Sequence, residues 1–357
     1  MIIGILTFHR SLNYGAVLQT YGLQKFLSQN FCDETYEIVD YRCPRFTDLY
    51  ESFSFFKRKS IKNLLKDIHF LVKRKVFNDF ISKHLNVSAI SYSTDSIIDA
   101  NKRYDKFIVG SDQVWNAEIT NGDLNYLLKF ATPDKRNSYA ASIGKNIILK
   151  KYEEEYRNEI NFFGNLSVRE QECRLVLQEI GITSKIQVNV DPTLLLKTHE
   201  WLELISDKRI CNRYVLVYAI KYSNELLETA IGFAEKRGYK VIYIGPRTKC
   251  KGIKRIRYAK VTDFVRYFRD AEYTFINSFH GTVFSVIFHK QFWVCNEEND
   301  WRNVRIENLL QLCELKDRFE FSNIHNDIDW NKVEEKINSE RDKAFNYLKE
   351  IIEYENS

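Results

Sequence analysis

Apolar runs alternate with amphipathic stretches along the chain, and this alternation predicts strands and helices in turn. Runs of strand length lie at residues 2–8, 36–41, 104–109, 136–143, 165–170 and 186–196, and again at 212–220, 240–246, 252–259, 273–277 and 291–294. Stretches with a helical period separate most of them. Alternating strands and helices predict an α/β protein whose sheets are parallel and covered by helices on both faces.

The alternation breaks near residues 197–211, and this break predicts two domains. At 357 residues the chain is also too long for one typical core. We expect an N-terminal domain over 1–197 and a C-terminal domain over 198–357, which ends in a long charged helix. If both domains turn their strand ends toward a shared interdomain cleft, the active site lies there.

The stretch 273–295 carries the strongest candidate for chemistry. A buried strand ends near Asn277, and a helix is expected from about Thr282. The turn between them carries Ser278, Phe279, His280 and Gly281. An imidazole just before a helix N-terminus, which favours an anion, is a candidate general acid or base. The alternative is a histidine that only caps the helix.

Polar loops follow three strands of the first half. They carry Asn13 and Tyr14, then Ser111, Asp112 and Gln113, and then Arg169. Hydroxyl, carboxylate and amide groups can bind a polyhydroxylated acceptor, and a guanidinium can hold a phosphate or carboxylate through two bonds. Alternatively, the short polar residues only cap turns, and Arg169 only pairs with Glu170 or a neighbouring carboxylate.

Residues 53–85 interrupt the pattern with a basic amphipathic stretch. Apolar residues lie roughly on one predicted helix face, and lysines and arginines lie on the other. Such a helix can lie on a membrane surface or contact lipid-linked phosphates. The alternative is a helical excursion that packs on its domain and turns a solvated charged face outward.

Composition narrows the choice of function. The net charge of +5 is compatible with anionic substrates and too small to indicate nucleic acid. The 7 cysteines are too scattered for a zinc knuckle or a redox dithiol. The chain has no G-x-G-x-x-G or P-loop motif, no visible metal cluster, no signal peptide and no apolar run of membrane-spanning length. We expect a cytoplasmic protein without a cofactor.

Six stretches, in this order, resemble the polysaccharide pyruvyl transferase family. They are GILTFHRSLNYGAVLQTYGLQKFL, YDKFIVGSDQVWN, SVREQE, VDPTLLL, SFHGTVFSVIFHKQF and RIENLLQLCELKDR. The resemblance implies two Rossmann-like domains arranged as in GT-B glycosyltransferases. It implies transfer of pyruvate from phosphoenolpyruvate to two hydroxyls of a sugar, which gives a ketal on an exopolysaccharide, capsule or cell-wall polymer.

The resemblance also assigns roles to residues. His280 matches the family's histidine in its His-Gly turn, and Arg169 matches its arginine in the S-V-R-E segment. Well-studied members have an arginine two residues before the histidine, where this chain has Ser278. Either another cation, for example Arg302 or Arg305, replaces that arginine, or the donor pocket differs. The expected donor site is Arg169, Ser278, Phe279, Gly281 and Arg305, and the expected acceptor wall is Asn13, Tyr14, Ser111, Asp112 and Gln113.

Two other functions fit the same sequence. One is a GT-B glycosyltransferase that uses a nucleotide sugar. The other is a non-catalytic adaptor for polysaccharide assembly, with residues 53–85 as its membrane-binding element. The resemblance favours phosphoenolpyruvate and a sugar acceptor, which can be lipid-linked, with contact to the inner membrane surface. Neither the acceptor sugar nor the oligomeric state follows from the sequence.

Overall fold

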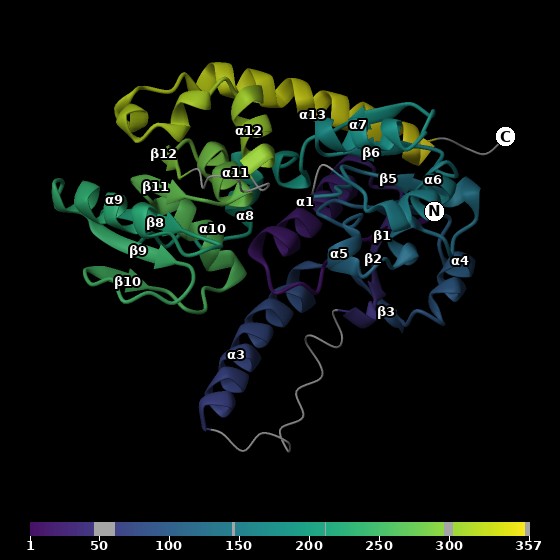
Figure 1. The fold of residues 1–357 in the computed structure, drawn as a ribbon, viewed down its shortest axis with the longest axis horizontal. Helices are drawn as coiled ribbons and strands as arrows, with labels where there is room; N and C mark the ends of the chain where they lie inside the picture. Colours follow the sequence, from purple (N-terminus) through teal and green to yellow (C-terminus); the bar gives the residue numbers. More distant parts are fainter. Residues whose placement is uncertain (46–60, 145–146, 211, 296–302, 354–357) are drawn as a thin grey trace. The chain divides into compact units, whose positions relative to one another are not determined.

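The computed structural model describes residues 1–45, 61–144, 147–210, 212–295 and 303–353. The chain forms two compact units. Unit 1 contains Met1–Leu195 and Glu340–Ser357, and unit 2 contains Leu196–Ser339. Each unit is built around its own parallel sheet, and each is described by itself below (Figure 1).

Unit 1 has a five-stranded parallel sheet in the order β3-β2-β1-β4-β5. The strands are β1 (Ile2–Leu6), β2 (Thr35–Tyr41), β3 (Val87–Tyr92), β4 (Lys106–Val109) and β5 (Arg136–Ser138). The strand order reverses between β1 and β4, because β1 pairs with both β2 and β4. In a sheet of this kind the ligand site lies beyond the carboxyl ends of the strands at the point of reversal.

The described part of unit 1 also contains a short two-stranded sheet and six helices, together with the end of the last helix. They are β6 (Leu166–Val168), β7 (Ile186–Val188), α1 (Tyr14–Asn30), α3 (Ile61–His84), α4 (Ala100–Arg103), α5 (Ala117–Thr120), α6 (Glu153–Ile160), α7 (Gln171–Glu179) and α13 (Trp330–Glu353). Helix α13 joins this unit through Tyr347, whose hydroxyl donates to the Ser138 carbonyl at 2.8 Å. Arg341 donates to the Leu194 carbonyl at 2.7 Å.

Unit 2 repeats the same strand order. Its parallel sheet runs β10-β9-β8-β11-β12. The strands are β8 (Tyr214–Tyr218), β9 (Lys240–Ile244), β10 (Ile253–Arg255), β11 (Tyr273–Ile276) and β12 (Gln291–Val294). Here the order reverses between β8 and β11, so the carboxyl ends of these two strands mark the expected ligand site.

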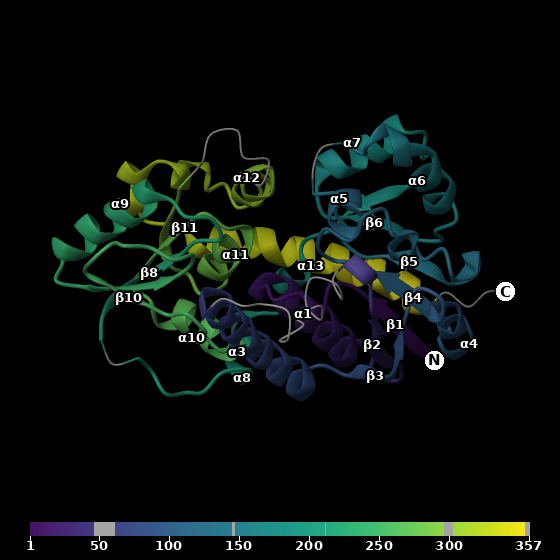
Figure 2. The ribbon, with the colours of Figure 1, turned by 60° about the horizontal axis from the view of Figure 1, so that its bottom comes forward.

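The helices of unit 2 cover both faces of its sheet. They are α8 (Thr198–Glu203), α9 (Asn224–Glu235), α10 (Val261–Asp270), α11 (Phe279–Ile287) and α12 (Asn303–Leu312). Helix α9 packs through Phe233 onto Phe275 on one face. On the other face Tyr218 packs against Phe264 of α10. Figure 2 shows α9 and α10 on opposite sides of the sheet.

Short 3₁₀ helices connect these elements. They are Ile97–Asp99, Leu124–Leu127, Pro133–Lys135, Lys150–Tyr152, Pro192–Leu194, Lys316–Phe319 and Phe321–His325. Within the described ranges, no helix combines the length and the apolar character needed to cross a membrane.

The expected fold class, α/β with parallel sheets in two Rossmann-like halves, is confirmed. The structure differs from the sequence-based prediction at several elements. Strand β3 was not expected, and the strand expected over 186–196 ends at Val188. The long final helix was placed wholly in the second domain, but from Glu340 onward it belongs to unit 1. Residues 53–60 of the basic stretch lie outside the described residues.

Candidate functional site

The carboxyl ends of β8 and β11 are tied together in unit 2 by one asparagine. The Asn277 side-chain oxygen accepts a hydrogen bond from the Ile220 amide at 3.1 Å, and its side-chain nitrogen donates to the Lys221 carbonyl at 3.0 Å. This bridge lies where the strand order reverses. The sequence predicted Asn277 only as the last residue of a strand. A polar residue that ends an apolar run at this position could have indicated its bridging role.

Helix α11 begins directly after Asn277. Ser278 is its N-cap, with an extended backbone and a hydroxyl that accepts from the Gly281 amide at 3.3 Å. The expected turn over residues 278–281 is therefore wrong, because His280 and Gly281 already belong to the first helical turn. The Ser278 cap starts the helix three residues earlier than the expected Thr282.

His280 lies in this first turn and is 8% exposed. Its ring meets the Phe279 ring edge-on, with centroids 5.1 Å apart. Gly281 lets the turn lie close to β8, since a Cβ at this position would be 2.9 Å from Cδ1 of Tyr218. Tyr218 is buried, and burial raises the pKa of its phenol. The first turn of α11, which carries the imidazole, therefore lies close to the carboxyl end of β8.

A cation from a different helix lies beside the same turn. The guanidinium carbon of Arg305, on α12, is 5.8 Å from the centre of the Phe279 ring. Arg302, the other expected replacement for a family arginine, lies outside the described residues. Unit 2 therefore brings five of the expected site residues together, namely Ser278, Phe279, His280, Gly281 and Arg305. A helix N-terminus with a nearby guanidinium favours a bound phosphate or carboxylate.

The corresponding edge of unit 1 is the loop that follows β4. Gly110 has φ of 117°, and a Cβ there would lie 2.2 Å from the Tyr139 carbonyl oxygen. The Gly110–Ser111 peptide is cis, and Asp112 follows with φ of 72°. Ser111 is fully buried, and its hydroxyl donates to the Ala140 carbonyl at 2.9 Å. Its side chain therefore holds the loop in place.

The remaining expected acceptor residues lie at different depths in unit 1. Asn13 is exposed and caps α1 by accepting from the Gly15 amide at 2.9 Å. The Tyr14 ring packs against Phe77 of α3 with centroids 5.1 Å apart. Gln113 is buried, with its side-chain amide beside Gly144. Asn13 thus makes the helix-capping contact that was the alternative to acceptor binding. Gln113 belongs to the loop after β4.

Arg169 lies at the end of β6 in a buried cluster of charges. Its Nε donates to Glu170 Oε1 at 2.7 Å, and its Nη1 donates to Asp191 Oδ2 at 2.8 Å. Burial alone would lower the pKa of Arg169. The carboxylates of Glu170, Asp191 and Asp112 outweigh this effect and raise the pKa above its usual value. Unit 1 therefore brings Arg169 near Asp112. Arg169 also makes the pair with Glu170 that was the alternative to a ligand-binding role.

A further polar cluster, which sequence reasoning did not single out, lies at the ends of β1, β2 and β3. Asp40 accepts from Arg10 Nη2 at 2.8 Å and from Arg42 Nη2 at 3.2 Å. The buried His9 ring lies 3.3 Å from the same carboxylate. Burial would raise the pKa of Asp40, but hydrogen bonds from His9, Arg10 and Ser91 lower it well below its usual range. The pair His9-Arg10 directly after a predicted strand is the feature of the sequence that could have indicated this cluster.

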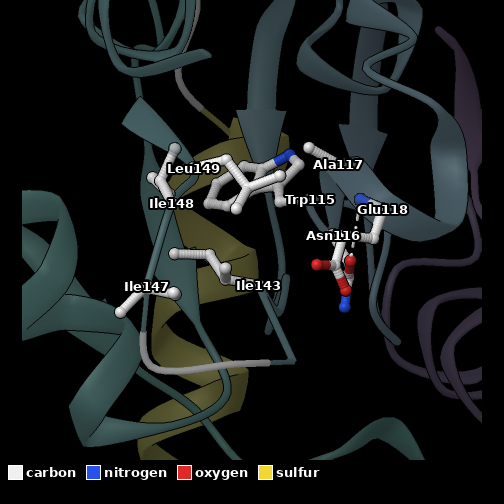
Figure 3. Close-up of a pocket in the computed structure, with 8 residues that line it drawn as sticks. All are labelled: Trp115, Asn116, Ala117, Glu118, Ile143, Ile147, Ile148 and Leu149. Carbon is white, nitrogen blue, oxygen red and sulfur yellow. Dashed lines mark hydrogen bonds between the residues drawn. The ribbon is translucent and has the colours of Figure 1, made fainter. Parts of the chain in front are cut away.

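A small pocket opens beside the β4 loop and is drawn in Figure 3. It is lined by residues 115–118, Ile143 and residues 147–149. Asn116 caps α5 by accepting from the Glu118 amide at 3.0 Å, the bond dashed in the figure. The pocket is mostly apolar, and its lining includes none of the expected site residues. In the described ranges, no three His, Cys, Asp or Glu side chains are placed to hold a metal ion.

Solved structures define the class of fold. A putative UDP-N-acetylglucosamine 2-epimerase from Listeria monocytogenes matches with a TM-score of 0.53 and 11% identity, over 99% of this chain and 96% of that one. The UDP complex of S. aureus MnaA matches with a TM-score of 0.50 and 12% identity, over 100% and 98%. At these identities the likeness shows the fold alone, which is of the GT-B type.

Sequence comparison places the chain within that class. Residues 13–299 match the family described as polysaccharide pyruvyl transferase, and this range is most of the chain. The protein therefore belongs to the polysaccharide pyruvyl transferase family, and the expected resemblance is confirmed. None of the curated proteins matches the chain significantly in sequence.

Proposed function

We propose that this protein transfers pyruvate from phosphoenolpyruvate to two hydroxyls of a sugar and so forms a cyclic ketal. Membership of the pyruvyl transferase family supports the class of reaction. One observation carries the choice of donor site. His280 lies in the first turn of α11, at the strand-order reversal of unit 2, and Arg305 lies beside that turn.

The proposed reaction begins with a proton transfer to the donor. His280 delivers a proton to the methylene carbon of phosphoenolpyruvate, which becomes the methyl group of the product. The resulting positive centre at C2 is attacked by one sugar hydroxyl, and the C–O bond to phosphate then breaks. A second hydroxyl attacks C2 and closes the ring. One hydroxyl proton replaces the proton that His280 gave, and the other leaves with the phosphate.

The donor's negative charges need positive partners. The phosphate and carboxylate are held by the N-terminus of α11 and by the Arg305 guanidinium. The Ser278 hydroxyl accepts from the Gly281 amide, so it fixes the turn that presents His280. In this proposal Arg305 replaces the family arginine whose place Ser278 takes. Arg169 belongs to unit 1, where it pairs with Glu170 and Asp191.

The proposed acceptor is a sugar, and unit 1 binds it. Ser111 already donates to the Ala140 carbonyl, so the loop offers the acceptor Asp112 and Gln113 first. Asn13 and Tyr14 lie at the N-terminus of α1 beyond β1, at the same reversal of strand order. The product would decorate an exopolysaccharide, capsule or other cell-surface glycan made in the cytoplasm. We propose no cofactor beyond the co-substrate.

Ligand-dependent stability tests the donor. A ligand that binds only the folded protein stabilises it by about 2.7 kcal/mol at a hundredfold excess over its Kd. We expect phosphoenolpyruvate to raise the melting temperature of the wild-type protein and to lose most of this effect with Arg305→Gln. The exposed Lys316 provides the control variant, Lys316→Gln. Stabilisation by UDP or GDP, and none by phosphoenolpyruvate, would instead support a nucleotide-sugar glycosyltransferase.

We also propose that α3 rests on an anionic membrane surface, which would suit a lipid-linked acceptor. The C-terminal half of α3 packs on α1 through Phe80 and Tyr21. Farther toward its N-terminus, Ile68, Leu71 and Val72 are 47%, 38% and 39% exposed. Residues 73–75, Lys-Arg-Lys, follow them directly. Exposed apolar side chains next to basic ones are typical of helices that lie in a membrane interface.

Vesicle sedimentation tests this contact. The variant Ile68→Ser/Leu71→Ser should reduce binding to phosphatidylglycerol vesicles, because it removes exposed apolar area from α3. Ile90 and Ile98 are exposed to a similar degree elsewhere in unit 1, so Ile90→Ser/Ile98→Ser is a matched control. Equal vesicle binding by both variants would contradict a membrane role for α3.

A further inference from the structure

A strongly basic segment follows β9 in unit 2. Residues 246–260, PRTKCKGIKRIRYAK, contain seven lysines and arginines and no aspartate or glutamate. The segment leaves the carboxyl end of β9, forms the edge strand β10 and returns toward α10. A run of like charges is most often a solvated surface. Here, however, one of these basic side chains lies beside a buried polar group.

Tyr243, Gly245 and Arg255 lie close together at the end of β9. Tyr243 and Arg255 are paired across β9 and β10, so their side chains lie on the same face of the sheet. The Arg255 guanidinium donates from Nε and Nη2 to the Gly245 carbonyl at 3.2 and 3.0 Å. A Cβ on Gly245 would be 2.5 Å from the Tyr243 hydroxyl oxygen, so that hydroxyl lies against the same backbone.

The Tyr243 hydroxyl is buried and unsatisfied. The residue is fully buried, and its oxygen has no hydrogen-bond partner among the residues that the structure describes. Burial raises the pKa of this phenol to about 12, so it remains a hydrogen-bond donor. Buried hydroxyls are almost always paired, and an orphaned one beside a cationic group needs an explanation.

The charged groups that act on Arg255, which lies beside this hydroxyl, include two other arginines. Burial lowers the pKa of Arg255, and the nearby Arg257 and Arg247 lower it further. Arg247 and Arg257 are exposed, and neither forms an ion pair with a carboxylate within the part of the chain that the structure describes. Guanidinium groups held near one another without a carboxylate raise the local potential and attract an anion.

We propose that Tyr243, Arg247, Arg255 and Arg257 form a binding site for the phosphate group of a ligand. Arg255 exchanges the Gly245 carbonyl for phosphate oxygens, and the Tyr243 hydroxyl, which lies against the same Gly245 backbone, donates to the phosphate. Arg247 and Arg257 add charge-assisted hydrogen bonds from the exposed side.

This site is separate from the donor site on α11 and goes beyond the proposed transfer reaction. Tyr243 faces the α9 side of the sheet, within the apolar cluster that contains Phe233 and Leu227. Helix α11 packs on the other side, where Phe284 meets Phe264 of α10. The phosphate can come from a soluble phosphorylated ligand or from a lipid headgroup, and the two sources share the same chemistry at the site.

Calorimetric titration with inorganic phosphate tests the site. To remove the proposed donor site from the measurement, every protein carries Arg305→Gln. In this background we expect saturable binding of one phosphate. Tyr243→Phe should weaken it by about tenfold, the effect of one hydrogen bond to a charged group. Arg247→Gln/Arg257→Gln should weaken it by at least as much.

The control removes equal charge from the other end of β9. Lys236 and Lys240 are exposed there, and Lys236→Gln/Lys240→Gln should leave phosphate affinity unchanged. Absence of saturable phosphate binding would overturn the proposal, and so would binding that Tyr243→Phe and Arg247→Gln/Arg257→Gln leave intact. Far-ultraviolet circular dichroism of each variant checks that it is folded. Because Arg305 is already replaced, these results do not depend on whether the protein uses phosphoenolpyruvate.

A second arm identifies the source of the phosphate. The same variants are sedimented with phosphatidylglycerol vesicles and with phosphatidylcholine vesicles. Loss of phosphatidylglycerol binding in Arg247→Gln/Arg257→Gln, but not in Lys236→Gln/Lys240→Gln, supports the site as a lipid-headgroup site. Saturable phosphate binding with vesicle binding equal in both variants supports it as a site for a soluble phosphorylated ligand.

Discussion

Two glycines illustrate how a single atom decides local structure in unit 2. Gly281 lies in the first turn of α11, where a Cβ would be 2.9 Å from Cδ1 of Tyr218 and 3.2 Å from Cγ2 of Ile276. Tyr218 is itself buried, and its ring packs edge-on against Phe264. Gly232 lies inside α9, and a Cβ there would have nothing within 4 Å.

These two positions give opposite predictions for the same substitution. Gly281→Ala should lower the free energy of unfolding by about 1–3 kcal/mol, because it overpacks a rigid contact. Gly232→Ala should raise it by up to about 1 kcal/mol, because alanine favours a helix more than glycine does. Urea denaturation measures both. Equal stability of Gly281→Ala and the wild-type protein would contradict the close packing of α11 on β8.

Individual site residues differ in how far the sequence reveals them. His280, Ser278 and Gly281 are consecutive or nearly so. The local pattern places them between a strand and a helix, although it predicts a turn where the structure has the N-cap and first turn of α11. The contact between Arg305 and Phe279 joins different elements, and the sequence offered Arg305 only as one of two candidates. The bond from Arg169 to Asp191 spans 22 residues and depends on the pairing of β6 with β7. Such partners follow from tertiary packing rather than from local pattern.

At the scale of elements, the Asp40 cluster joins the ends of three neighbouring strands. Arg10 follows β1, Asp40 lies near the end of β2, and Ser91 lies near the end of β3. The lowered pKa of Asp40 means that the folded state favours the ionised carboxylate. This contribution to stability is present above the unfolded-state pKa of about 3.9, and it is lost as the pH falls below that value.

A pH series with one variant tests this linkage. Asp40→Asn should be less stable than the wild-type protein at neutral pH, and the gap should narrow as the pH falls below about 4. The exposed Asp134 gives the control, since Asp134→Asn should follow the wild-type protein at every pH. Urea denaturation at several pH values measures the gap. A gap that stays constant down the acid range would show that Asp40 is not held ionised by its partners.

Elements with strong apolar patterns were predictable, and weaker ones were not. Strand β8 is a continuous apolar run, and β12 is apolar after Gln291. Both lie within the expected ranges. Strand β3 was missed because it is an edge strand with three consecutive exposed residues, so it has no apolar run. The strand expected over 186–196 ends early because Asp191 accepts from the Thr193 amide at 3.0 Å and starts a 3₁₀ helix.

At the scale of the whole molecule, two sheets with the same strand order carry the site residues. The sequence predicted the alternation of strands and helices, while the resemblance implied the Rossmann-like halves. Helix α13 is the clearest departure, since its residues from Glu340 onward belong to unit 1. Its charged sequence reads as one continuous helix. Bonds to residues far along the chain, such as those of Arg341 and Tyr347, assign its end to unit 1.

The central claim is that this protein joins pyruvate to a sugar, with His280 as the acid and base. Mass spectrometry of candidate sugar acceptors incubated with phosphoenolpyruvate tests it most directly, together with an assay of released phosphate. The wild-type protein should add the mass of pyruvate less one water and release one phosphate per ketal. His280→Ala should lose about a hundredfold to ten-thousandfold in rate while keeping its melting temperature. Ketal formation at the wild-type rate by folded His280→Ala would contradict the account.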